Sequence, residues 1–166
     1  MRILGIDPGS RRTGLGIIEL DGSRLRHIHH CVLQVGDGDF SLRLLELYRG
    51  VRDLIAEFGP IEAAMEDQFV AQNAGTALKL GQARGALVVA CAEAGLGVTP
   101  YPPATVKQAV CGYGRADKQQ MQQMIALLLK PPGKLPVDAA DALGIALCHA
   151  HHLPLRRIAQ AARAAA

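Results

Sequence analysis

Four acidic residues have positions at which they could act together: Asp7, Glu66, Asp138 and Asp141. Asp7 and Glu66 each end a short apolar run, which predicts an acid at the tip of a buried strand. Asp138 and Asp141 are three residues apart in a predicted helix, so both side chains turn toward the same side. The four acids come from three separate segments, and the fold could bring them together.

A cluster of four carboxylates would favour one kind of chemistry. Like charges about 4 Å apart repel and raise one another's pKa unless cations occupy the cluster. Oxygen ligands alone select Mg²⁺, or Mn²⁺ as a substitute, over Zn²⁺. Two such ions about 4 Å apart suit phosphodiester hydrolysis, which needs neither an organic cofactor nor a nucleophilic side chain. The sequence contains no G-x-S-x-G elbow or P-loop as a competing centre.

Each acid also has an ordinary structural interpretation. Asp7 could be a turn residue, because short acids are common before a Pro-Gly pair. Glu66 could be exposed, with Asp67 an equal candidate that points to the opposite face of the strand. Asp138 and Asp141 could be an N-cap and an N3 acid that favour the helix dipole. The pattern alone leaves these alternatives open.

The elements that must position the acids can be predicted from periodicity. Apolar and alternating runs predict strands at residues 2–6, 13–20, 25–35, 61–66 and 97–101. The second and third strands meet at Asp21-Gly22, a strong hairpin signal. Helical spacing and stop signals predict helices at about 41–58, 73–94, 104–110, 117–129 and 137–152. This order predicts an α/β fold with a five-stranded mixed sheet flanked by helices.

The composition indicates one globular domain over residues 1–166, with an Ala/Arg-rich tail from about 153 to 166. Hydrophobic residues make up 49% of the chain and charged residues 20%. Since no apolar run reaches the roughly 18 residues of a membrane-spanning helix, and an acid interrupts the N-terminal apolar run, we expect a cytoplasmic protein without membrane contact. The net charge of +3 permits a polyanionic partner without requiring one.

Two further groups of side chains allow two interpretations each. His149, His151 and His152 could form a metal cluster, but in the final turn of a helix they would complement its dipole, and we favour the dipole. A row of small residues at helical spacing, Ala77, Gly81 and Gly85, would let another helix approach closely. That helix could belong to a second copy of the chain, or the row could pack on the protein's own sheet. Four cysteines without a C-x-x-C pair indicate reduced thiols.

Several segments, taken in order, resemble the RuvC family of Holliday-junction resolvases. They are Gly5-Ile6-Asp7-Pro8-Gly9-Ser10 with Thr13-Gly14, Met65-Glu66, Leu78-Lys79-Leu80-Gly81-Gln82-Ala83-Arg84-Gly85, Val106-Lys107-Gln108 and Asp138-Ala139-Ala140-Asp141-Ala142. The resemblance covers nearly the whole chain. It implies an RNase H-like fold, and a homodimer whose two active sites make paired nicks in symmetric strands of a four-way DNA junction during recombination and repair. It also implies cooperation with a branch-migration motor.

The resemblance extends to individual site residues. Asp7, Glu66, Asp138 and Asp141 match the family's metal-binding carboxylates, although some relatives carry His at the position of Asp138. Lys107 and Lys118 match basic positions near the scissile strand, where an ammonium group can contact phosphate. Phe69 could stack on an unpaired base at the junction centre, or be a core or dimer-interface residue. By their charge alone, Arg84 and Arg115 are weaker candidates for DNA contact.

Three other functions are compatible with part of the pattern. A related RNase H-like nuclease would cut RNA–DNA hybrids instead of junctions. An ATPase domain would use the turn from Asp7 to Ser10, but it needs a second phosphate loop and a second lobe, for which 166 residues leave little room. A junction-binding protein without catalysis becomes less favourable if all four carboxylates converge.

Overall fold

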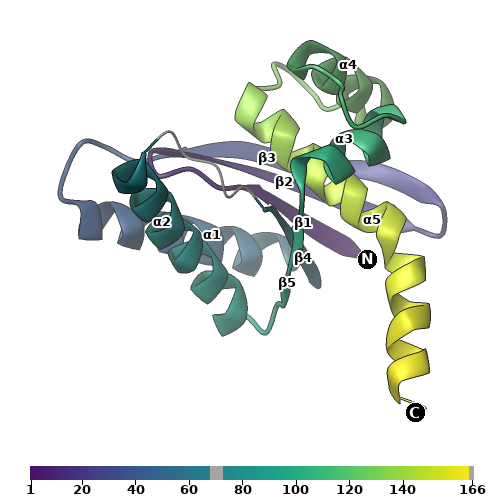
Figure 1. Cartoon of the computed structure of the whole chain (residues 1–166), viewed down its shortest axis with the longest axis horizontal. Helices are drawn as coiled ribbons and strands as arrows, with labels where there is room; N and C mark the ends of the chain where they lie inside the picture. Colours follow the sequence, from purple (N-terminus) through teal and green to yellow (C-terminus); the bar gives the residue numbers. More distant parts are fainter. Residues whose placement is uncertain (68–72, 165–166) are drawn as a thin grey trace.

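One mixed five-stranded sheet forms the centre of the protein, whose computed structural model describes residues 1–67 and 73–164. The strand order is β3-β2-β1-β4-β5 (Figure 1). The strands are β1 (Arg2–Asp7), β2 (Arg12–Asp21), β3 (Arg24–Gln34), β4 (Glu62–Glu66) and β5 (Val98–Tyr101). β1 pairs antiparallel with β2 and parallel with β4. The predicted mixed sheet and its β2–β3 hairpin are therefore confirmed.

Five helices connect and follow the strands: α1 (Phe40–Phe58), α2 (Ala74–Glu93), α3 (Pro103–Cys111), α4 (Lys118–Leu129) and α5 (Val137–Ala164). Side chains of Asp39, Asn73 and Asp117 accept hydrogen bonds from backbone N–H groups at the starts of α1, α2 and α4. The predicted end of the last helix near His152 was wrong, because α5 continues to Ala164. Pro154 removes one helical hydrogen bond, but the Ala-rich segment after it strongly favours helix.

The two faces of the sheet are covered by separate layers of helices. Leu4 and Ile6 of β1 point into a core shared with α1 and α2. Ile3 points to the other face and packs in the core that α3, α4 and α5 form with the sheet. The sheet is thus buried between two helical layers (Figure 1). Within the described part of the chain, no helix is both long and apolar enough to cross a bilayer.

The first half of α5 lies directly on the backbone of β1 and β2, because glycines line that part of the sheet. A Cβ atom on Gly5 would lie 2.0 Å from the carbonyl oxygen of Ala142, and one on Gly14 would lie 1.9 Å from the carbonyl oxygen of Asp138. Neither position has room for a larger residue unless the helix moves away. The glycines therefore set the beginning of α5 close to the end of β1.

Candidate active site

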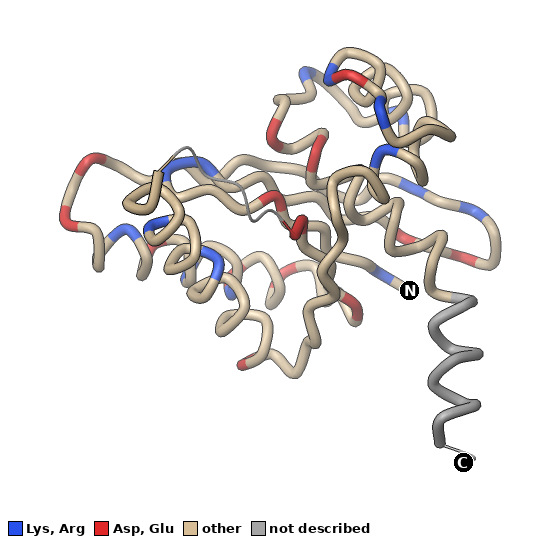
Figure 2. The backbone as a smooth tube through the Cα atoms, viewed as in Figure 1, with Lys and Arg blue, Asp and Glu red and all other residues tan. Residues whose placement is uncertain are grey.

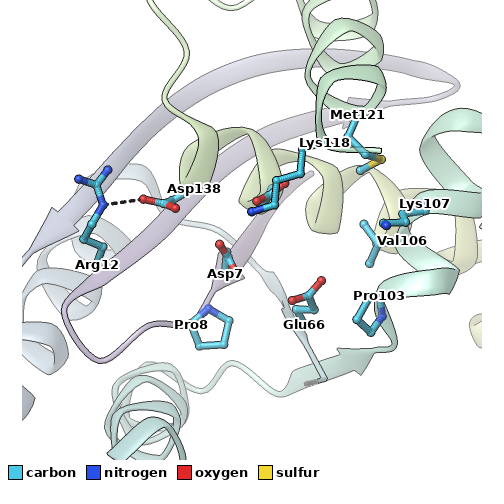
Figure 3. A pocket seen from close by; sticks show the side chains of 11 residues that line it. Asp7, Pro8, Arg12, Glu66, Pro103, Val106, Lys107, Lys118, Met121 and Asp138 are labelled. Carbon is cyan, nitrogen blue, oxygen red and sulfur yellow. Dashed lines mark hydrogen bonds and ion pairs between the residues drawn. The ribbon is translucent and has the colours of Figure 1, made fainter. Parts of the chain in front are cut away.

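All four predicted carboxylates line one open pocket of about 400 Å³. Asp7 ends β1 and Glu66 ends β4, and the carboxyl ends of two paired parallel strands meet at the same edge of the sheet. Asp138 and Asp141 come from the first turns of α5, which lies over that edge. The rest of the lining is Pro8, Arg12, Pro103, Val106, Lys107, Lys118 and Met121 (Figure 3).

Short-range contacts hold the two strand ends in place. The buried Thr13 hydroxyl donates to the carbonyl oxygen of Gly9 at 2.9 Å, which closes the loop after Asp7. Arg84 of α2 donates a hydrogen bond to the carbonyl oxygen of Glu66 and forms an ion pair with Asp67 at 3.2 Å. Asp67, the equal candidate at this strand end, is thus engaged with α2, and the carboxylate in the pocket lining is that of Glu66.

The pocket concentrates negative charge in a partly buried place. Burial raises the pKa of Asp7 to about 8, with further increases from Asp141, Glu66 and Asp138. Burial and then Asp138 also raise the pKa of Asp141, while Lys118 and Lys107 lower it. Figure 2 shows acidic positions near the centre of the molecule and basic positions on the α3 and α4 side above them. Such a cluster would be stabilised by a cation.

The donor set of the pocket suits a hard divalent cation, because every candidate ligand is a carboxylate oxygen. Among the described residues, however, no three His, Cys, Asp or Glu side chains are grouped closely enough to hold an ion as they stand. Asp138 is turned toward Arg12, whose Nε donates to its Oδ2 at 2.8 Å (Figure 3). The Asp138 carboxylate is therefore paired with Arg12 in the structure.

The helix-capping interpretation of Asp138 and Asp141 is wrong. Helix α5 begins at Val137, and the Ala140 N–H donates to the carbonyl oxygen of Pro136, the residue before the helix. Asp138 is consequently the second residue of the helix and Asp141 the fifth, so neither has the N-cap or N3 position. An acid in the first turn still favours the helix dipole.

The predicted basic residues separate into three groups. Lys107 and Lys118 line the pocket from α3 and α4, and their ammonium groups face the carboxylates (Figure 3). Arg115 is exposed in the loop before α4 and is not part of the lining. The guanidinium of Arg84 is engaged in the internal contacts with the end of β4. Phe69 lies outside the described residues.

Arg12 lines the pocket but was missed by sequence reasoning. Two arginines adjoin at the start of β2, and alternation along a strand sends neighbours to opposite sides. Arg11 pairs with Asp37, whereas Arg12 pairs with Asp138. The adjacent arginines could have been recognised in the sequence as candidates for the site. Which of them reaches the pocket is decided by the register of β2 against α5.

The favoured interpretation of the three histidines was wrong for His149. Because α5 continues to Ala164, His149 does not lie in a final helical turn, and it is completely buried against Tyr101 and Glu62. Two alternatives were open for the small residues of α2, Ala77, Gly81 and Gly85. They are exposed, which argues against packing on the protein's own sheet. All four cysteines are free thiols, as predicted.

Comparison with known proteins gives the family. The profile described as "Crossover junction endodeoxyribonuclease RuvC" matches residues 3–149. The chain belongs to the RuvC family. The RuvC protein of Ectopseudomonas mendocina is 52% identical over 150 residues, which are 90% of this chain and 86% of the relative. That of Geobacter metallireducens is 49% identical over 164 residues, or 98% and 100% of the two chains.

A solved RuvC structure shares the fold. RuvC of Thermus thermophilus in complex with a Holliday junction substrate superposes with a TM-score of 0.87 at 35% identity, covering 93% of this chain and 96% of that chain. The fold is therefore RNase H-like, as the sequence resemblance implied. The matched region includes the segments that carry Asp7, Glu66, Asp138 and Asp141.

Proposed function

We propose that this chain is a metal-dependent endonuclease that resolves Holliday junctions by paired, symmetric phosphodiester hydrolysis in DNA recombination and repair. The observation that carries the proposal is the pocket in which four carboxylates from β1, β4 and α5 face two lysines. Membership of the RuvC family supports it. A relative of the same fold is solved with a Holliday junction substrate, which supports the choice of DNA.

In this proposal Asp7, Glu66, Asp138 and Asp141 would hold Mg²⁺, with Mn²⁺ as a substitute and two ions per site. The bound cations supply activation of water and stabilisation of the leaving oxygen. Because its pKa is raised to about 8, Asp7 is mostly protonated at neutral pH in the metal-free pocket, and positive charge that enters the pocket favours its ionisation. Lys107 and Lys118 approach the pocket from the other side and would neutralise phosphate oxygens of the scissile strand.

The proposal includes a homodimer, because symmetric nicking needs two sites. The row Ala77, Gly81 and Gly85 is exposed on α2 next to the exposed side chains of Leu78 and Val89. Small residues allow a second helix to approach closely, and the apolar neighbours supply surface to bury. Sedimentation of the chain at micromolar concentration should give a dimer, and Leu78→Asp with Val89→Asp should shift it to a monomer.

Two wider expectations follow from the proposed substrate. A resolvase acts where chromosomal DNA is, so we expect a cytoplasmic enzyme. We also expect it to work with a branch-migration motor, which would move the junction to a preferred cleavage sequence. Co-sedimentation of the chain with such a motor on a four-way junction tests this expectation.

A cleavage assay on a synthetic four-way junction tests the central proposal. Linear duplex and RNA–DNA hybrid of the same sequence serve as control substrates, and each is incubated with Mg²⁺, with Ca²⁺ and with a chelator. We expect paired nicks only in the junction and only with Mg²⁺, because Ca²⁺ coordination is longer and looser. Preferred cleavage of the hybrid would instead favour an RNA–DNA hybrid nuclease. Junction binding without nicking in any metal would favour a non-catalytic binding protein.

Asp138 provides a variant for the same assay. Asp138→Asn removes the charge that would balance a cation but keeps the size of the side chain, so we expect a folded protein that binds junctions and loses cleavage. Asp53 is exposed on α1 outside the pocket, and Asp53→Asn serves as the matched control. Cleavage by Asp138→Asn at the wild-type rate would remove this carboxylate from the ligand set.

A further inference from the structure

We propose that Arg12 is an internal counter-ion for Asp138, which holds this carboxylate away from the other three until a divalent cation displaces the guanidinium. The inference rests on the metal site of the proposed function and adds a residue that regulates its loading. It makes Arg12 a positioning residue, because its guanidinium acts through Asp138.

The contact itself is direct and lies at the pocket. Arg12 Nε donates to Asp138 Oδ2 at 2.8 Å, and both residues belong to the lining. Figure 3 shows the Asp138 carboxylate turned to Arg12, while the carboxylates of Asp7 and Glu66 lie on the other side of it. One acid of the cluster is thus already neutralised by the protein, and it is the acid that is turned away.

The backbone around Arg12 explains why this arginine reaches Asp138. A Cβ atom on Gly9 would lie 2.0 Å from the carbonyl oxygen of Arg12, so the preceding loop packs against the Arg12 peptide group. Two residues further along β2, Gly14 packs against the carbonyl oxygen of Asp138. The backbones of β2 and α5 are therefore in contact next to the ion pair. This contact places the backbone of Arg12 near that of Asp138.

The ion pair between Arg12 and Asp138 is weak enough for a divalent cation to displace it. The side chain of Arg12 is 53% exposed and that of Asp138 is 29% exposed, so water screens the attraction. A divalent cation coordinated by several carboxylates attracts Asp138 more strongly than one screened guanidinium does. Arg12 should thus weaken cation binding by a small factor, roughly two- to fivefold, without preventing it.

The neighbouring residue supplies a matched control. Arg11 forms an ion pair of similar length with Asp37, 2.7 Å, and lies outside the pocket lining. Arg11→Gln and Arg12→Gln remove the same charge from adjacent positions. A difference between them therefore reports the contact with Asp138, because both lower the net charge of the protein equally.

Binding of Mn²⁺ to the metal-free full chain, measured by electron paramagnetic resonance without DNA, tests the proposal. We expect Arg12→Gln to bind Mn²⁺ about two- to fivefold more tightly than the wild type, and Arg11→Gln to bind it as the wild type does. Arg12→Lys keeps a charge near Asp138 and should restore most of the wild-type Kd. In an Asp138→Asn background, Arg12→Gln should bind Mn²⁺ no more tightly than Arg11→Gln.

Two results would overturn this role for Arg12. If Arg11→Gln and Arg12→Gln increase the affinity for Mn²⁺ equally, the effect comes from overall charge. If Arg12→Gln binds Mn²⁺ more weakly than the wild type, Arg12 promotes cation binding. Circular dichroism and thermal unfolding check that each variant is folded. Failure of the proposed metal site is separately visible, because Asp138→Asn and Glu66→Gln would then bind Mn²⁺ like the wild type.

Discussion

The two ends of β4 carry two polar clusters of opposite character. At its carboxyl end, Glu66 joins the carboxylate pocket, in which the pKa of Asp7 is raised to about 8. At its amino end, Glu62 lies 3.3 Å from Nε2 of the completely buried His149, whose Nδ1 lies 3.1 Å from the Tyr101 hydroxyl. The Tyr101 hydroxyl, the His149 ring and the Glu62 carboxylate thus form one hydrogen-bonded chain.

The difference lies in how each cluster balances its charges and donors. The His149 cluster joins a hydroxyl, an imidazole and a carboxylate by hydrogen bonds inside the protein, so it stabilises one packing of α5 against β4 and β5. The pocket brings together four groups that, when ionised, only accept hydrogen bonds, and its internal cations are lysines and Arg12 at the rim. A satisfied polar cluster supports the fold, whereas a cluster with excess negative charge favours an external cation.

The largest effect should separate the two glutamates of β4. Glu66→Gln should reduce junction cleavage by roughly 10²–10³-fold or more, because an amide cannot balance the charge of a cation. Glu62→Gln makes the same chemical change at the other end of the strand and should leave single-turnover cleavage close to the wild-type rate. Similar losses in both variants would contradict the functional distinction between the two ends.

Substitution of His149 should lower the stability of the fold and leave junction cleavage unchanged. His149→Ala should lower the free energy of unfolding by about 2–4 kcal/mol, because it leaves a cavity and removes the hydrogen bond between the ring and the Tyr101 hydroxyl. Urea denaturation measures the loss, and His151→Ala, an exposed change on the same helix, should stay within about 0.5 kcal/mol of the wild type. A loss of cleavage by folded His149→Ala at low temperature would assign this cluster a catalytic role.

Neutralising Asp7 should stabilise the metal-free protein while it removes activity. The pKa of Asp7 rises from 3.8 to about 8 on folding, so its contribution to stability is present below pH 3.8 and is lost as the pH rises through 8. The amide of Asp7→Asn does not ionise, so this variant does not lose that contribution. Its free energy of unfolding at pH 8 should exceed that of the wild type by roughly 1–3 kcal/mol.

Denaturation in a chelator at pH 5 and at pH 8 measures this effect. The advantage of Asp7→Asn should grow between the two values and shrink when Mg²⁺ is added, because the cation stabilises the wild type. An advantage that is equal at both pH values would show that the ionisation of Asp7 is not its cause.

The smallest effect should come from the lysines at the rim of the pocket. Lys107→Ala should weaken junction binding a few-fold and reduce the slope of log K against log salt by about 1, with little change in stability. Lys134, an exposed residue outside the pocket lining, provides the control variant Lys134→Ala. Binding by Lys107→Ala that matches the control across a salt titration would make Lys107 an ordinary surface lysine.

The sequence by itself determined most of the local structure. The hairpin at Asp21-Gly22 and the helix starts at Asn73 and Asp117 depend on neighbouring residues, so strand and helix limits were predicted to within about one residue. The end of α5 was the exception. Local signals near His152 and Pro154 predicted a stop, but the helix continues through them.

Only the tertiary structure decided how the candidate site is arranged. The sequence supplied four acids at strand ends and on one helix, but left Glu66 and Asp67 as equal candidates and gave no reason to pair Arg12 with Asp138, which are 126 residues apart. The choice of Glu66 depends on the contact between Asp67 and Arg84 of α2. The pairing of Arg12 with Asp138 depends on how closely α5 approaches β2, which Gly14 permits. Side-chain periodicity specifies faces within an element, whereas contacts between distant elements arise from packing.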